Sequence, residues 1–135
     1  MMKPCFIVLL TLSLAVLGGC LGRPMQQTGD VGYLEGRVSI GPLCPVERSP
    51  PEPACTPSLE TYHAWPIGVW TAGRERQVAS IEPDENGAYR VGLPAGTYTV
   101  DLVKPGRFGG NLPATVTITG NETTLLDITI DTGIR

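Results

Sequence analysis

Residues 91–100 have the sequence VGLPAGTYTV, and this stretch decides the fold class. Apolar side chains alternate with smaller or polar neighbours up to Leu93, and the same period of two returns from Tyr98 onward. Such alternation is typical of strands that bury one face. Between the two runs, Pro94-Ala95-Gly96 combines the fixed φ of proline with the conformational freedom of glycine, which suits a tight turn. The stretch therefore predicts two strands joined by a short turn.

The same pattern recurs on both sides of this stretch. It predicts seven strands, with a turn roughly every ten residues. Pro66 indicates that the second strand starts late or lies at an edge, and Asn86-Gly87 predicts the turn before the fourth. No stretch after residue 20 has helical periodicity. The residues therefore predict an all-β fold, a seven-stranded antiparallel β-sandwich of Greek-key type. The expected strands cover residues 33–40, 65–70, 77–81, 88–93, 97–103, 114–119 and 124–130.

Composition agrees with this fold class and excludes several functions. The 135 residues include 17 Gly and 13 Pro, and only 17% are charged, which argues against a helical bundle or a coiled coil. The net charge is -3 and no basic cluster occurs, so nucleic acid is not an expected partner. The single histidine, His63, excludes any site that needs two. We predict neither a metal site nor a catalytic residue, and therefore no enzyme.

The first twenty residues predict export. Lys3 precedes an apolar stretch over residues 6–17 that is too short to span a bilayer, which takes about 20 residues, and that fits a cleaved signal. The segment ends in Leu17-Gly18-Gly19-Cys20, which resembles the bacterial lipobox. That resemblance implies cleavage before Cys20 and a diacylglycerol on its thiol. An ordinary secretory signal and a short uncleaved anchor are the alternatives.

The chain is therefore expected to have three parts. Residues 1–19 are the predicted lipoprotein signal peptide, residues 20–32 the lipidated cysteine and a flexible tether, and residues 33–131 the β-sandwich domain. The lipid on Cys20 is the only expected cofactor, and two or more acyl chains attach a protein stably to a membrane. Leu21, rather than Asp, follows this cysteine. We therefore expect the outer membrane of a bacterial envelope or, where none exists, the outer face of the cytoplasmic membrane.

Cys44 and Cys55 are the two cysteines that remain in the predicted domain. In an exported chain they are most simply a disulfide. A metal site would need two more soft or imidazole ligands, and only His63 is available. Proline cannot donate to a sheet ladder, so the segment around this pair is expected to be an irregular excursion. Its six prolines are Pro42, Pro45, Pro50, Pro51, Pro53 and Pro57.

Four segments, taken in order, carry a family resemblance. They are LEGRV at 34–38, PDENGAY at 83–89, the stretch at 91–100, and GPLCPV at 41–46 with Cys55 after it. The first three match the G-x-V strand, the D-x-x-G-x-[FY] hairpin and the L-P-x-G-x-Y-x-[VL] signature of the carboxypeptidase regulatory-like domain. Residues 33–103 thus resemble this transthyretin-like (prealbumin-like) sandwich, and the fourth segment is similar to a subgroup of exported bacterial proteins. The resemblance implies an accessory domain rather than a catalyst.

The densest aromatic group consists of Tyr62, His63, Trp65 and Trp70, which are candidate ligand-binding residues. Sandwich domains that bind sugars use exposed aromatic rings against the apolar faces of pyranoses. The competing interpretation places Trp65 in the core and lets Tyr62 and Trp70 cover a sheet edge, since large aromatic side chains are mostly buried.

Two functions from different classes follow. The first is a membrane-anchored, non-enzymatic lipoprotein whose sandwich has a structural or protein-interaction role in the cell envelope, with an envelope protein as partner. The alternative is a carbohydrate-binding module that holds a polysaccharide on the aromatic residues of 62–70. Exposed and coplanar tryptophans favour the second function, and buried tryptophans favour the first.

Overall fold

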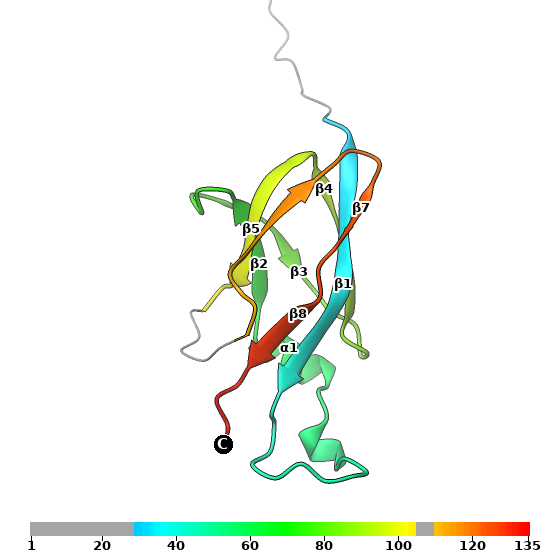
Figure 1. The fold of residues 1–135 in the computed structure, drawn as a ribbon, viewed down its shortest axis with the longest axis vertical. Coiled ribbons are helices and arrows are strands. Elements are labelled where there is room, and N and C mark those ends of the chain that lie inside the picture. Colours follow the sequence, from blue (N-terminus) through cyan, green and yellow to red (C-terminus); the bar gives the residue numbers. More distant parts are fainter. Residues whose placement is uncertain (1–28, 105–109) are drawn as a thin grey trace, which may run out of the picture.

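The computed structural model describes residues 29–104 and 110–135. The predictions for the signal peptide at 1–19, for Cys20 and for the tether up to residue 28 lie outside the described residues. Two β-sheets pack face to face, which confirms the predicted all-β sandwich (Figure 1). The elements are β1 (Val31–Gly41), a 3-10 turn (Pro53–Cys55), α1 (Leu59–Ala64), β2 (Ile67–Thr71), β3 (Gln77–Ile81), β4 (Ala88–Pro94), β5 (Gly96–Leu102), β6 (Ala114–Ile118), β7 (Thr123–Leu125) and β8 (Ile128–Asp131).

The pairing of the strands differs from the prediction in one sheet. The sheet with strand order β3-β2-β5-β6 is antiparallel throughout, as expected. In the other sheet, β1 is central and β4 pairs with it in antiparallel orientation. On its other side, however, β7 and β8 run parallel to β1. The expectation of a wholly antiparallel sandwich is therefore wrong for the end of the chain.

The seventh predicted strand, 124–130, is two strands in the structure because the chain bends between them. The carbonyl of Leu126 lies where a Cβ on residue 36 would stand, so only Gly36 leaves room for it. The amide of Leu126 still donates to the Glu35 carbonyl at 2.9 Å. The next amide of β1, that of Arg37, donates instead to the Asp127 carboxylate at 2.9 Å. A side chain thus replaces the backbone partner where the parallel ladder is interrupted.

The core consists of the inward-facing side chains of both sheets, and it follows the predicted alternation. Leu34, Val69, Val100 and Ile128 have no exposed surface. β2 begins only after Pro66, which confirms that the proline delays this strand. The other buried core residues are Val38, Ile40, Tyr62, Ile67, Ile81, Tyr89, Leu93, Tyr98, Val116, Ile118 and Ile130.

A short helix, α1, contradicts the expectation that no helix follows residue 20. Ser58 caps it, since its hydroxyl accepts from the Thr61 amide while the Thr61 hydroxyl accepts from the Ser58 amide. The helix is only six residues long, too short for helical periodicity to show in the sequence. Within the described ranges, no helix has the length and apolar character needed to cross a membrane.

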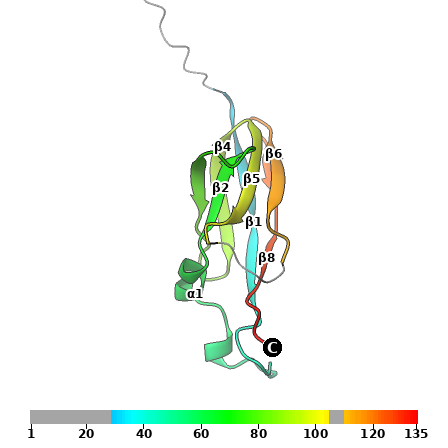
Figure 2. The same ribbon diagram turned by 90° about the vertical axis from the view of Figure 1, so that its left-hand side faces the viewer.

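The two ends of the sandwich carry different parts of the chain. β1 starts at one end and ends at the other, and its 11 residues span about 35 Å (Figures 1 and 2). The β4–β5 turn lies at the end where β1 starts. The excursion between β1 and β2, with α1, lies at the opposite end, where the described chain also terminates (Figure 2). The point where β1 begins is therefore far from the proline-rich segment.

Candidate functional site

The residues of the family-like motifs hold turns rather than form a site. One oxygen of the Asp84 carboxylate accepts from the amides of Asn86 and Ala88, at 2.8 and 3.0 Å. Gly87 has a φ of +78°, and the Val38 carbonyl lies close to where its Cβ would be. The D-x-x-G pattern is thus explained by the turn that joins β3 to β4.

The two tyrosines of these motifs bond to the backbone. The buried Tyr89 hydroxyl donates to the Leu126 carbonyl, the same group that requires Gly36. The Tyr98 hydroxyl donates to the Pro94 carbonyl at 2.6 Å and closes the β4–β5 turn. Burial raises the pKa of both hydroxyls, because a tyrosinate would lose its hydration there. These tyrosines therefore stabilise the fold through backbone hydrogen bonds, and their hydroxyls remain protonated at neutral pH.

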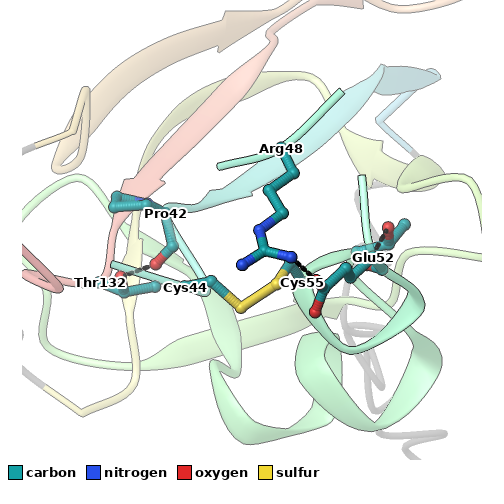
Figure 3. Close-up of a disulfide and its surroundings, with 7 residues drawn as sticks. Pro42, Cys44, Arg48, Glu52, Cys55 and Thr132 are labelled. Carbon is teal, nitrogen blue, oxygen red and sulfur yellow. Dashed lines mark hydrogen bonds and ion pairs between the residues drawn. A yellow bond between two sulfur atoms is a disulfide. The ribbon is translucent and has the colours of Figure 1, made fainter. Parts of the chain in front are cut away.

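The predicted disulfide between Cys44 and Cys55 is confirmed, with sulfur atoms 2.05 Å apart (Figure 3). It closes a segment that we call the stapled loop, residues 42–57. The guanidinium of Arg48 lies 3.1 Å from the Glu52 carboxylate within this loop. Where β1 leads into the loop, the Thr132 hydroxyl donates to the Pro42 carbonyl and links the loop to the C-terminal segment (Figure 3).

The stapled loop presents apolar surface to solvent. Its Val46 side chain is 69% exposed, and Leu59, just after the loop on α1, is 40% exposed. The same loop also contributes most of the lining of a hollow of about 360 Å³, including Leu43, Arg48 and Pro51. Because the disulfide and the prolines restrict the loop, this surface exists before any partner binds. It is suited to contact with another molecule.

The four candidate ligand-binding residues do not share one surface. Tyr62 is 6% exposed and belongs to the core, so its ring cannot stack on a sugar, and the prediction that it covers a sheet edge is wrong. Burial and the nearby Asp84 carboxylate raise the pKa of Tyr62, while the Arg37 guanidinium acts in the opposite direction. Trp65 is half-buried and packs against the core, and His63 is exposed on α1.

Trp70 lies apart from the other three, on the outer face of the second sheet. Its ring lies directly above Gly68, and the Arg74 guanidinium stacks 5.0 Å from the ring centroid. Arg74 in turn forms an ion pair with Asp101 of β5. Trp70 therefore covers its own sheet and Trp65 packs against the core, so neither is the fully exposed ring that sugar binding was expected to need.

A second hollow, of about 560 Å³, lies on the outer face of the first sheet. The backbone of Gly36 and the small side chain of Ala88 lie in its lining, among charged side chains of β1, β4 and the β3–β4 turn. Sequence reasoning missed it. Its only signal was the set of charges that alternate along two strands, Glu35 and Arg37 on one and Arg90 on the other, and the sequence does not reveal their register.

Comparison with known proteins identifies no family. No family model matches the chain, and no curated protein matches its sequence. The fold is similar to that of a DUF3823 family protein from Parabacteroides merdae, with 17% identity and a TM-score of 0.46, over 76% of this chain and 46% of that one. It is also similar to GBS52, the minor pilin of Streptococcus agalactiae, with 14% identity and a TM-score of 0.48, over 76% of this chain and 45% of that one.

A third solved structure, the TIE protein of Bacillus anthracis, has 15% identity and a TM-score of 0.44, over 76% of this chain and 16% of that one. The chain spans less than half the length of each of these three proteins. These likenesses are those of all-β domains. The carboxypeptidase regulatory-like resemblance stays a prediction from the motifs.

Proposed function

We propose that this protein is an exported, lipid-anchored and non-enzymatic lipoprotein that presents the stapled loop to another protein of the cell envelope. One observation carries the proposal: β1 starts at one end of the sandwich, and the stapled loop lies at the other. An anchor that precedes β1 would therefore hold one end near the membrane and leave the loop at the end that faces away.

The reach of the anchor supports this arrangement. Ten residues, 21–30, separate the expected lipid on Cys20 from Val31, the first residue of β1, and they extend to at most about 35 Å. The rigid body adds about 35 Å along β1 before the stapled loop begins. The loop would thus be presented well beyond the lipid headgroups.

The stapled loop itself suits a protein partner. It exposes Val46 and carries an oppositely charged pair, Arg48 and Glu52, and Leu59 is exposed just after it. Apolar centres with polar rims are the usual composition of protein interfaces. A loop already held by a disulfide loses little conformational entropy on binding, which favours affinity. The accessory role implied by the family resemblance agrees with this proposal, whereas the aromatic residues do not assemble a sugar platform.

Site-specific photo-crosslinking in intact cells tests the proposal. A photoreactive amino acid replaces Val46 in the stapled loop, and the matched control replaces Ala95 in the β4–β5 turn, which is also exposed but lies at the opposite end. We expect a discrete crosslinked protein from position 46 and not from position 95. The proposal is contradicted if position 46 yields no crosslinked protein, or if both positions yield the same set.

The anchor is tested separately by cell fractionation. We expect the unaltered chain in the membrane fraction and the Cys20→Ala variant outside it, since the variant lacks the thiol that takes the lipid. Equal membrane association of both chains would contradict the anchor while leaving the partner of the stapled loop open to the crosslinking test.

A further inference from the structure

The hollow on the outer face of the first sheet owes its shape to the register of β1 and β4. Ala88 stands opposite Arg37, and Arg90 stands opposite Glu35. The small side chain of Ala88 leaves a depression between larger neighbours, whose volume of about 560 Å³ falls within the range of small-molecule sites.

On one side of the hollow, the charged side chains already have partners. The guanidinium of Arg90 lies 3.7 Å from the Glu35 carboxylate and stacks 4.0 Å from the centroid of the Tyr33 ring. Asp127 is also held in place, because one of its carboxylate oxygens accepts from the amide of Arg37 at 2.9 Å. Arg90, Glu35 and Asp127 thus already have partners within the protein.

The other side carries charges that lack partners. In the described part of the chain, the guanidinium of Arg37 and the carboxylate of Glu82 form no ion pair within 4.0 Å. Asp84 uses one oxygen to hold its turn, and its second oxygen has no hydrogen bond to any described residue. Arg37 and Asp84 both lie in the lining of this hollow.

We propose that this hollow binds a ligand with an ammonium and a carboxylate group close together, as in a free amino acid. The Arg37 guanidinium would take the carboxylate, since its planar fork matches two oxygens. Glu82 and Asp84 would take the ammonium group. The four carboxylates around the hollow outnumber its two guanidiniums, so a ligand with a second ammonium group, as in lysine, fits best.

Calorimetric titration of the full chain with L-lysine tests this proposal, and lysine amide, which lacks the carboxylate, is the second probe. We expect lysine to bind about tenfold more tightly than lysine amide, because only lysine makes the charge-assisted bond to Arg37. The Arg37→Gln variant should bind both probes equally. The Glu82→Gln variant should bind both more weakly. Arg76→Gln, an exposed arginine in the β2–β3 hairpin, is the matched control and should behave like the unaltered chain.

Two results would overturn the proposal. One is the absence of lysine binding by the unaltered chain, and the other is a lysine affinity that Arg37→Gln and Glu82→Gln leave unchanged. Circular dichroism of each variant shows that the fold is retained, which is expected because both side chains are exposed. The test requires neither the anchor nor the stapled loop, so its outcome is independent of the proposed function.

Discussion

The bond between Tyr89 and Leu126 allows the most detailed prediction. The Tyr89→Phe substitution removes only the hydroxyl, which donates to the Leu126 carbonyl at the point where β7 gives way to β8. The side chain is 5% exposed, so water cannot easily replace the lost donor. An unsatisfied buried group costs about 1–3 kcal/mol. We therefore expect the free energy of unfolding to fall by about 1–3 kcal/mol.

Urea unfolding, followed by tryptophan fluorescence, measures this change. The midpoint should fall while the slope with denaturant stays constant, since the surface exposed on unfolding is nearly unchanged. Tyr33→Phe is the matched control, because Tyr33 is 38% exposed and its hydroxyl bonds to no described residue. We expect this control to stay within about 0.5 kcal/mol of the unaltered chain. If both variants are equally stable, the bond to Leu126 does not hold the strand break.

Three other outcomes test the same account. Gly36→Ala places a Cβ on the Leu126 carbonyl, so we expect a loss of about 1–3 kcal/mol in denaturant unfolding, and an unchanged midpoint would show that the site has room. Burial raises the pKa of Tyr62, Tyr89 and Tyr98 above the ordinary value of 10.0, so their contribution to stability is full below pH 10 and is lost as the pH rises further. Each adds a slope of up to about 1.4 kcal/mol per pH unit, and urea midpoints that do not fall above pH 10 would contradict this. Replacing Cys44 and Cys55 by Ser should cost about 3 kcal/mol and lower Tm without unfolding the sandwich, whereas an equal Tm would show that the loop needs no bridge.

Most strands were predictable because a half-buried strand has alternating apolar and polar residues, a pattern that is visible within the strand itself. The expected ranges for β3 and β4 agree with the structure within one residue, and the inward faces are those that the alternation predicts. The disulfide was also predictable, since the predicted export signal and lipidation account for the other two cysteines and leave Cys44 and Cys55 as a pair. The strand prediction depends on residues that are neighbours in the sequence, and the disulfide prediction depends on the small number of cysteines.

The parts that the sequence did not reveal depend on contacts between distant residues. The break at Leu126 exists because Gly36, 90 positions earlier, admits its carbonyl. β7 and β8 likewise pair in parallel with residues of β1 that lie 90 positions earlier in the chain. α1 begins at a capping box, and the helix itself is too short to show a periodic pattern in the sequence. Tyr62 enters the core because this helix packs beneath the sandwich, which no local pattern indicates.

The candidate sites also have features that the sequence predicts and features that only the fold reveals. The stapled loop could be predicted from its cysteines and prolines, but its position opposite the start of β1 required the fold. The charged hollow could not be predicted, because it depends on the register that sets Ala88 against Arg37. The aromatic cluster was predicted from proximity along the chain alone, and the alternation of β2 sends Trp70 to the outer face.

Mass spectrometry of the native product, isolated from membranes without reduction, tests the central claim most directly. We expect a chain that begins at Cys20, carries the mass of its acyl groups, and lacks two hydrogens for the bond between Cys44 and Cys55. A product that keeps residues 1–19, or that has an unmodified thiol at Cys20, would contradict the account of a sandwich that is lipid-anchored to the membrane at the end where β1 begins.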